Sequence, residues 1–341
     1  MALVYKEALQ ALIDRRDFSY EEMHALMHQV MGGELTPAQI AGVLIGLRMK
    51  GETVDEIAAA AEVMRSLAIK VSIHQTDHLV DTCGTGGDGI QTFNVSTAGA
   101  FVAAAAGASV AKHGGRSVSS TCGSIDVLEA LGVNVNQTPE QVAKAVDEIG
   151  IGFMFAPNHH SAMKHAAPVR RELGVRTMFN LLGPLTNPAG AKRQVMGVFH
   201  RDLTRLLAGA HQRLGNEHVM VVHGADGMDE ISFAGDTYVA ELKNGQIQEY
   251  IVNPQQFGIP LHQADTIRVQ NAEESKAMVL DVLNGKPGPA RDIVLLNAGA
   301  AIYVAGLAEN LATGIDRARA AIDSGAALQK LGQLKALAPA I

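Results

Sequence analysis

The first 68 residues place apolar side chains with the period of an α-helix. The apolar positions of one stretch are Met23, Leu26, Met27 and Val30. Residues 19–22 and 53–56 each place a hydroxyl three positions before a glutamate, and Thr36 precedes a proline, so helices should begin at these points. Gly51 should end the helix that follows Thr36. The pattern predicts four short helices. Their core would be thin, so we expect the bundle to rest on another part of the chain.

From about residue 76, short apolar runs alternate with helical periodicity. The expected strands are residues 79–80, 109–111, 151–155, 194–199 and 218–222, and the expected helices are 97–106, 124–131, 139–149 and 203–214. Asn244 and Gly245 form a typical two-residue turn, which predicts a hairpin of strands 238–243 and 246–252. From Glu273 onward we expect three helices. The chain therefore reads as α/β, with a small N-terminal helical domain and a larger α/β domain around a central mixed, mostly parallel sheet.

Composition excludes several classes of function. The chain has 341 residues, of which 47% are apolar, but no apolar run is long enough to cross a membrane. A net charge of −7 argues against a general nucleic-acid-binding protein. Cys83 and Cys122 are too few for a disulfide framework and lack the spacing of a zinc site. The N-terminus lacks a signal-peptide pattern. We therefore expect a cytoplasmic protein without membrane or nucleic-acid partners.

Two loops rich in glycine and hydroxyl groups, residues 81–89 and 112–120, carry the strongest chemical signal. Glycine lets the backbone approach an anion closely, and successive backbone N–H groups can then form a concave anion site. Lys112 and Arg116 add the cationic donors that phosphates need. Two such loops close together predict a ligand with more than one phosphate.

Two common nucleotide-binding motifs do not account for the first loop. Residues 84–89 match the spacing of a dinucleotide fingerprint, but the following helix should start only after a further polar stretch. The next strand ends in Lys112 and His113, where that fingerprint requires an acid. The Walker A pattern also fails, because no lysine and hydroxyl residue close the loop. A plain tight turn would leave Asp88, Thr92, Asn94 and Ser96 without a role.

Two further segments supply chemistry. Asp229 and Glu230 follow the expected strand 218–222, and their carboxylates suit Mg²⁺ bound together with phosphates; alone, they would read as an acidic turn. Residues 155–187 carry Arg170, which suits a bidentate contact with a carboxylate. The same segment contains three histidines without a matching acid or cysteine, so we expect no metal there; they are His159, His160 and His165. This segment should therefore bind an acidic second substrate.

Taken together, six motifs resemble the anthranilate phosphoribosyltransferase family over nearly the whole chain. They are Gly-Thr-Gly-Gly-Asp-Gly (84–89), Thr-Phe-Asn-Val-Ser-Thr (92–97), Lys-His-Gly-x-Arg (112–116), Asp-Val-Leu-Glu-Ala-Leu-Gly (126–132), Asn-Leu-Leu-Gly-Pro-Leu-Thr-Asn-Pro (180–188) and Asp-Gly-Met-Asp-Glu (226–230). The resemblance implies transfer of phosphoribose from phosphoribosyl pyrophosphate to the amine of anthranilate, in tryptophan biosynthesis. It further implies a fold of the nucleoside phosphorylase and phosphoribosyltransferase type. A helical domain of residues 1–70, joined by helices from about 161–190, would pair with an α/β domain of residues 71–341, and the N-terminal helices would form a homodimer.

The resemblance also implies which residues bind the substrates. The phosphoribosyl pyrophosphate site would contain Gly84, Gly87, Asp88, Thr92, Asn94, Val95, Ser96, Thr97, Lys112, Ser119, Ser120 and Ser124. The anthranilate site would contain Gly84, Gly115, Arg170, His113, His160, Gly183 and Pro184. The Mg²⁺ ligands would be Ser96, Asp229 and Glu230.

The chain departs from the family pattern at two positions. Gly115 stands where the family usually has an asparagine that helps to position anthranilate, and Ser161 stands where proline is common. Two other functions also remain open. A nucleoside phosphorylase of similar architecture would use inorganic phosphate, but the acids at 229 and 230 argue against it. A relative that binds nucleic acid without catalysis is opposed by the acidic net charge and by the two intact loops.

Overall fold

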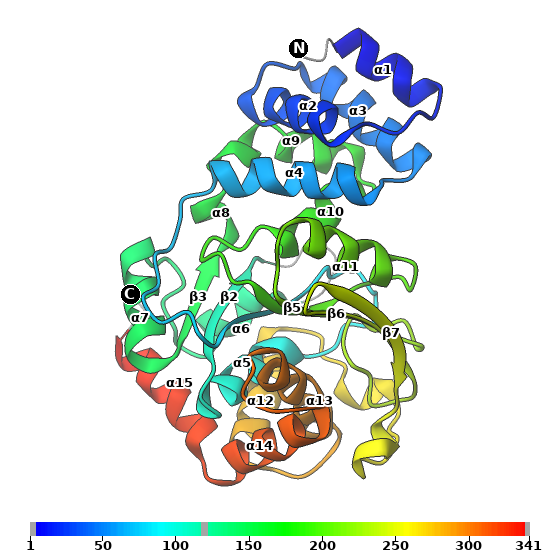
Figure 1. The fold of residues 1–341 in the computed structure, drawn as a ribbon. Coiled ribbons are helices and arrows are strands. Elements are labelled where there is room, and N and C mark those ends of the chain that lie inside the picture. The colour runs from blue at the N-terminus through cyan, green and yellow to red at the C-terminus, as the bar shows by residue number, and fades with distance from the viewer. Residues whose placement is uncertain (1–4, 117–121, 338–341) are drawn as a thin grey trace.

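The computed structural model describes residues 5–116 and 122–337. Its N-terminal part is a bundle of α1 (Tyr5–Ile13), α2 (Tyr20–Gly32), α3 (Pro37–Lys50) and α4 (Val54–Leu67) (Figure 1). The expected start signals are confirmed. Ser19, Thr36 and Thr53 each accept a hydrogen bond from the backbone N–H three residues later, and the side chain at that position bonds back to the cap. Gly51 follows the last turn of α3, as expected.

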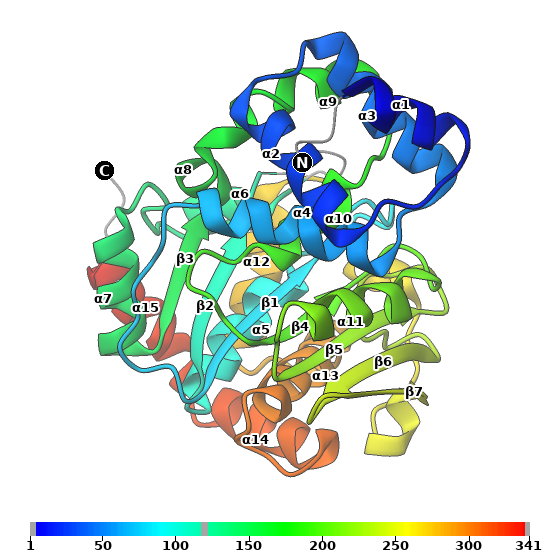
Figure 2. The same ribbon diagram turned by 45° about the horizontal axis from the view of Figure 1, so that its top comes forward.

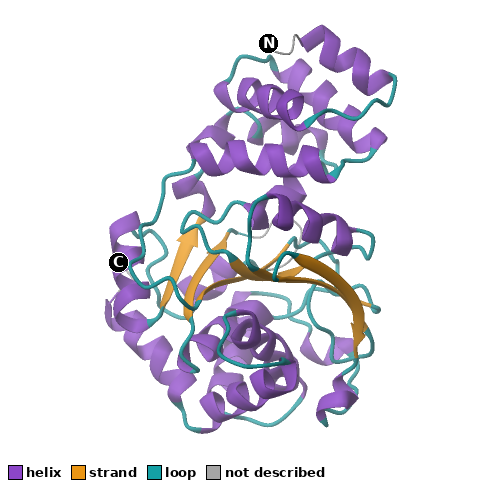
Figure 3. Cartoon of the chain, viewed as in Figure 1, coloured by secondary structure: helices purple, strands orange, loops and turns teal. Residues whose placement is uncertain are grey.

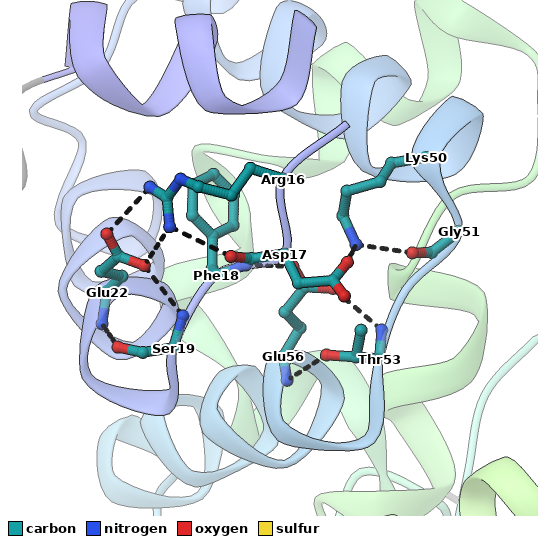
Figure 4. Close-up of polar contacts among 9 residues, drawn as sticks. All are labelled: Arg16, Asp17, Phe18, Ser19, Glu22, Lys50, Gly51, Thr53 and Glu56. Carbon is teal, nitrogen blue, oxygen red and sulfur yellow. Dashed lines mark hydrogen bonds and ion pairs between the residues drawn. The ribbon is translucent and has the colours of Figure 1, made fainter. Parts of the chain in front are cut away.

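A buried ion cluster ties the ends of these helices together (Figure 4). Lys50 Nζ lies 2.9 Å from the Glu56 carboxylate and 2.6 Å from that of Asp17, and it also donates to the Gly51 carbonyl. Glu56 is fully buried, and it accepts further hydrogen bonds from the backbone N–H groups of Phe18 and Thr53. Every charge in this cluster therefore has a partner within the protein.

Seven strands form the central sheet of the C-terminal part: β1 (Leu79–Gly84), β2 (Ser109–Gly114), β3 (Ile151–Phe155), β4 (Arg193–Gly197), β5 (His218–Gly224), β6 (Thr237–Lys243) and β7 (Gln246–Val252). Their order in the sheet is β3-β2-β1-β4-β5-β6-β7. The first five strands in this order are parallel, and the β6–β7 hairpin continues the sheet antiparallel (Figure 3). The mixed, mostly parallel sheet is confirmed. Strand β1 is longer than expected, because its pairing with β4 continues through Gly84.

Helices cover both faces of the sheet. One face packs against α5 (Val95–Ala105), α13 (Pro289–Val304) and their neighbours α12 (Ala272–Leu283), α14 (Leu311–Asp323) and α15 (Ala326–Leu337). The other face packs against α11 (Leu203–Arg213), which in turn contacts α4. The prediction of three helices after Glu273 was wrong. The turn at Ser324 and Gly325, where Gly325 has a φ of 75°, separates α14 from α15 and makes four.

The segment that follows β3 crosses back to the N-terminal bundle. It contains α8 (Ala156–His159), η1 (Ser161–Lys164), α9 (Ala167–Leu173), α10 (Phe179–Leu182) and η2 (Gly183–Leu185). Figure 1 shows α9 and α10 next to the helices of the bundle. Buried side chains of this segment, including Val169 and Leu182, share one hydrophobic cluster with α2, α3 and α4. The bundle therefore rests on this segment and on α11, which supplies the core that four helices alone lack.

Four further elements complete the described part of the fold. They are α6 (Ser124–Ala130), α7 (Pro139–Ile149), η3 (Pro254–Phe257) and η4 (Ala264–Ile267). Of these, α7 packs against β2 and β3. No helix of the described residues has both the length and the apolar character that a membrane span requires.

Candidate active site

The candidate site lies at the carboxyl edge of the parallel strands, on the side that faces the helical bundle (Figure 2). The chain leaves β1 toward β2 on one side, whereas β4 pairs with β1 on the other. Ligands of open α/β sheets bind at such a reversal of strand order. The loops after β1 and β4 meet there, since Thr85 N–H donates to the Gly197 carbonyl at 2.9 Å and Phe199 N–H donates to the Thr85 hydroxyl at 3.2 Å.

Asp229 enters this edge through gaps that two glycines leave. A Cβ on Gly84 would lie 2.3 Å from Asp229 Oδ2, and a Cβ on Gly197 would lie 1.5 Å from the Asp229 carbonyl oxygen. The Gly86 N–H donates to Asp229 Oδ2 at 2.8 Å. The glycine loop after β1 and the acidic segment after β5, far apart in sequence, are therefore in direct contact.

The protein balances the charges of Asp229 and Glu230 only in part. Burial raises the pKa of Asp229 to about 7, with the Asp88 charge adding to the shift. Burial, with the Asp229 charge, raises the pKa of Glu230 to about 8, although Lys112 partly opposes the shift. Buried like charges of this kind favour a divalent cation. No described residues form a ready cluster of three or more histidine, cysteine or acidic ligands. The two acids with Ser96 therefore suit Mg²⁺, which needs few protein ligands when phosphates supply the others.

Lys112 is the central cation of the site. It lies at the end of β2, is 3% exposed, and donates to Ser96 Oγ at 3.0 Å and to the Thr82 carbonyl. Beneath it, Asp81 is buried, and burial raises the pKa of this carboxyl while Lys112 opposes the rise. Lys112 is thus held next to Ser96, at the start of α5.

The polar stretch before α5 is arranged around the helix N-terminus. Asn94 caps α5, and its side chain accepts from Ser275 Oγ at 2.7 Å and from the Cys122 thiol at 3.2 Å. Val95 packs in the core, and Thr97 is buried with a hydroxyl that has no hydrogen-bond partner. Thr92 pairs with Arg268 in an isolated bridge. The late start of α5 agrees with the rejection of a dinucleotide fingerprint.

The second glycine loop is described only in part. Ser119 and Ser120 lie outside the described residues. A Cβ on Gly114 would lie 2.4 Å from Ser124 Oγ, so this glycine permits a close approach of α6. Arg116, expected as a phosphate donor, is instead paired with Asp126 and Glu129, each at 2.7 Å.

Two neutral histidines form the opposite side of the site. His113, at the end of β2, and His160, after α8, lie edge to face with ring centroids 5.0 Å apart. Burial lowers the pKa of His113 to about 3 and that of His160 to about 4, and neighbouring histidines add to both shifts. The Nε2 atom of each ring is buried without a hydrogen-bond partner. The carbonyl of Pro184 accepts from Gln194, which fixes the Gly183-Pro184 turn to β4.

Arg170 on α9 has no ion pair with any described residue. Burial lowers its pKa, and its guanidinium faces the Phe179 ring at 5.3 Å. Among the described residues, no hydrogen bond or ring contact joins Arg170 directly to either histidine. His160 lies in the same segment of the chain as Arg170, whereas His113 lies on β2. His159 is engaged with the Ile69 carbonyl, and His165 packs against Gly33, so neither joins a metal cluster.

Comparison with known proteins defines the family. Residues 76–328 match the α/β domain model of a glycosyl transferase family, and residues 6–68 match the helical bundle domain model of such a family. The chain is 68% identical to the anthranilate phosphoribosyltransferase of Methylobacillus flagellatus, over the full length of both chains. It belongs to the anthranilate phosphoribosyltransferase family.

Solved structures of anthranilate phosphoribosyltransferases share the fold. The Thermus thermophilus enzyme is 43% identical, with a TM-score of 0.92 over 97% of this chain and 98% of that one. The Saccharomyces cerevisiae enzyme in complex with phosphoribosyl pyrophosphate and Mg is 26% identical, with a TM-score of 0.88 over 98% and 97%. The yeast enzyme has also been solved with 4-fluoroanthranilate. The family resemblance and the fold class expected from the sequence are confirmed.

Sequence reasoning missed several polar residues beneath this anthranilate phosphoribosyltransferase site. Asn187 Nδ2 donates to Asp81 Oδ2 at 2.8 Å and to the Ala111 carbonyl at 2.9 Å. Gln194 Nε2 donates to the Pro184 carbonyl at 2.8 Å and approaches Asp81 at 3.3 Å. Arg176 was missed as well. Asn187 belonged to the motif of residues 180–188, but its contact with Asp81 was not predicted. Gln194 is a polar residue inside an apolar strand, which indicates a buried network without naming its partners.

Proposed function

We propose that this chain transfers the phosphoribosyl group of phosphoribosyl pyrophosphate to the amine of anthranilate, giving N-(5-phosphoribosyl)anthranilate and pyrophosphate in tryptophan biosynthesis. One observation carries the proposal beyond family membership. Three features lie together at the carboxyl ends of the central strands: a glycine loop, a buried lysine, and two buried acids with raised pKa values. This is the chemistry that a pyrophosphate with a divalent cation requires.

The donor would lie along the loop after β1 and the start of α5. Backbone N–H groups of the glycine loop and the Lys112 ammonium would stabilise the negative charge that grows on the pyrophosphate as its bond to ribose breaks. Lys112 is already held by Ser96 and Thr82, so it needs little reorganisation when the charge develops. Asp88, Thr92, Asn94, Thr97 and Ser124 complete the proposed donor site, together with Ser119 and Ser120, which lie outside the described residues.

We propose Mg²⁺ as the cofactor, held by Ser96, Asp229 and Glu230. When bound, it would neutralise charge on the pyrophosphate and orient the leaving group. The Gly86 N–H keeps the Asp229 carboxylate turned toward the glycine loop. The raised pKa values of the two acids show how poorly the protein alone balances their charges.

Anthranilate would bind between the two histidines and the Gly183-Pro184 turn, with Arg170 available for its carboxylate. The unpartnered Nε2 atoms of His113 and His160 would face the acceptor as neutral groups at pH 7. The aromatic amine can lose its proton late in the reaction, so positioning matters more than a strong base.

A fluorescence assay tests the proposal. Anthranilate fluorescence should fall only when protein, phosphoribosyl pyrophosphate and Mg²⁺ are all present. A constant signal with all three would refute the transferase function. Phosphorolysis of a pyrimidine nucleoside with inorganic phosphate, without loss of anthranilate, would identify the nucleoside phosphorylase alternative instead.

The organisation of the protein is part of the same proposal. We place the boundary of the helical domain near residue 70, with residues 161–190 joining that domain and residues 71–341 otherwise forming the donor-binding domain. A homodimer through the N-terminal helices is supported by Ile13 and Met49, which are 65% and 69% exposed on α1 and α3. Sedimentation velocity of the wild type and of Ile13→Lys with Met49→Lys tests this assembly. The proposed compartment is the cytoplasm, where the two free cysteines would stay reduced.

A further inference from the structure

Arg176, which the sequence analysis did not assign to the site, contacts the glycine loop after β1. Arg176 lies between α9 and α10, in the segment that crosses to the helical bundle. Its guanidinium donates a hydrogen bond to the Gly87 carbonyl and stacks on the Phe199 ring, with its central carbon 4.1 Å from the ring centroid. Arg176 therefore lies where the loops after β1 and β4 meet.

Glycine at position 87 makes room for this arginine. Gly87 has a φ of 80°, and a Cβ there would lie 3.1 Å from Arg176 Nη2. Stacking on Phe199 holds the guanidinium plane, so its direction is set before a ligand binds. The bond to Gly87 uses only part of the donor capacity, since a guanidinium carries five N–H donors.

The charge of Arg176 is also available. It forms no ion pair with any described residue, and it is exposed at the surface of the loop. Arg116, by contrast, is bound to two carboxylates, and Lys112 is buried among its partners. Of these three cations near the glycine loops, Arg176 is the one that can turn several free donors toward an incoming phosphate.

We propose that Arg176 binds the pyrophosphate group of the donor, with Phe199 as the positioning residue that holds its guanidinium plane. This inference rests on the proposed function, because it assigns a further contact to the same donor. Paired N–H groups of arginine match two phosphate oxygens, which a lysine ammonium does not reproduce. The bound pyrophosphate would then contact both the glycine loop after β1 and the segment between α9 and α10 that carries Arg176.

Titration of the full-length protein with magnesium pyrophosphate tests the inference without requiring turnover. Arg176→Met should raise the dissociation constant about 10- to 100-fold, because hydrogen bonds to charged groups are lost. Arg176→Lys should recover only part of the affinity, and Phe199→Leu should weaken binding about threefold. The matched control is Arg171→Met, an exposed arginine of α9 that should bind within about twofold of the wild type.

Steady-state kinetics then separate binding from a structural role. For Arg176→Met, the KM for phosphoribosyl pyrophosphate should rise about as much as the dissociation constant, while the KM for anthranilate stays within about twofold. Equal changes in both KM values together with a lower melting temperature would show that Arg176 only holds the loop, and would overturn the inference.

The titration distinguishes failure of this inference from failure of the proposed function. If the wild type binds magnesium pyrophosphate and Arg176→Met binds equally well, the assignment of Arg176 is overturned while the transferase proposal stands. If the wild type binds magnesium pyrophosphate without consuming anthranilate, the transferase proposal fails, and the loss of affinity in Arg176→Met still supports the contact. No binding by the wild type overturns the contact.

Discussion

The helical bundle and the sheet edge each bury acidic side chains, but they treat them differently. In the bundle, Glu56 accepts hydrogen bonds from Lys50 and from two backbone N–H groups (Figure 4). At the sheet edge, Asp229 and Glu230 lie close to each other with Lys112 as the main opposing charge, and their pKa values rise. The buried charge of Glu56 is balanced by protein groups alone, whereas the charges of Asp229 and Glu230 are not.

This difference separates structural charges from functional ones. A buried charge that the protein fully pairs contributes to a defined fold, and removing a partner is costly. A buried charge that the protein balances only in part can instead bind a ligand or ion of opposite charge, and so indicates a functional site. The same reasoning applies to the neutral His113 and His160, whose Nε2 atoms are buried without a partner, and to the arginines. Arg116 forms ion pairs with two carboxylates, whereas Arg170 and Arg176 form none with the residues that the structure describes.

The largest expected effect comes from removing the unbalanced acids. Asp229→Asn combined with Glu230→Gln should lower turnover by about a thousandfold or more, because a whole divalent-cation site is lost. Thermal stability should stay the same or rise, since two buried like charges are removed. Turnover at limiting Mg²⁺ and a melting curve measure the two effects.

A charge-matched control uses two exposed acids of the C-terminal region. Glu309→Gln combined with Asp316→Asn removes the same formal charge far from the sheet edge and should leave turnover unchanged. Near-normal turnover of the Asp229 and Glu230 double variant at limiting Mg²⁺ would refute the metal assignment. It would also show that the partly balanced charges of Asp229 and Glu230 do not mark a functional site.

The opposite result is expected in the bundle. Lys50→Met leaves the buried Glu56 carboxylate without its cation and should lower the free energy of unfolding by about 3–5 kcal/mol. Below the melting transition, kcat and both KM values should remain close to those of the wild type. Urea unfolding provides the measurement, with the exposed Lys144→Met as control, for which about 0.5 kcal/mol or less is expected. A stable Lys50→Met variant with impaired turnover would reverse the roles given to the two clusters.

Local signals allowed much of the fold to be predicted. Helix start signals act within four residues, so the sequence showed where α2 and α4 begin from their capping boxes and where α3 begins from Thr36 and the proline after it. Apolar runs marked most strands. The extension of β1 was not predicted, because Asp81 is a polar residue in a buried strand. Its carboxylate accepts hydrogen bonds from Asn187 and Gln194, more than a hundred residues away, and from the His113 backbone N–H, which the sequence pattern does not show.

The sequence allowed the residue types of the candidate site to be predicted, but not which of these residues contact one another. The motifs located Lys112, Asp229 and the glycine loop, and the structure brings these segments together. The sequence could not show that Arg116 pairs with Asp126 and Glu129, because choice of an ionic partner depends on tertiary distances. For the same reason Arg176, isolated in the sequence, gave no sign of its contact with Gly87.

The free energy of unfolding should depend moderately on pH, and in different pH ranges for His113 and His160, on one side, and for the hydrogen-bonded Glu241, on the other. The folded pKa values of His113 and His160 lie near 3 and 4, below the ordinary 6.5, so their contribution to stability is complete above about pH 6.5 and falls as the pH drops toward those values. At pH 5 each histidine should cost about 2 kcal/mol relative to pH 8. Burial of His211, whose pKa is about 3, adds a similar loss.

Glu241 titrates in a different range. Hydrogen bonds from His218, Tyr250 and Tyr303 outweigh burial and lower its pKa to about 2, so its contribution is lost only as the pH falls from about 4.5 toward 2. Between pH 5 and 7 the free energy of unfolding depends on these histidines and, with the opposite sign, on Asp229 and Glu230, so the contribution of one histidine is measured as the difference between the wild type and its variant. His113→Asn should flatten this part of the profile, and the exposed His200→Asn should not. An unchanged slope in His113→Asn would show that His113 is not held neutral.

The smallest expected effect concerns Gly115, which stands where the family usually has asparagine. A Cβ at this position meets no atom of the described residues within 4 Å, and the backbone is not in the left-handed region, so we expect Gly115→Asn to fit against them without strain. If acceptor binding here lacks one side-chain hydrogen bond, this variant should lower the KM for anthranilate about threefold to tenfold and leave that for phosphoribosyl pyrophosphate unchanged. Gly115→Ala stiffens the loop to a similar degree but supplies no amide, so it is the matched control. Equal KM values for the two variants would mean that loop stiffness, and not a missing hydrogen bond, is what this position controls. The Nε2 atoms of His113 and His160 would then remain the buried polar groups of the acceptor side that lack a partner in the protein, and so the groups in which this side still differs from the bundle.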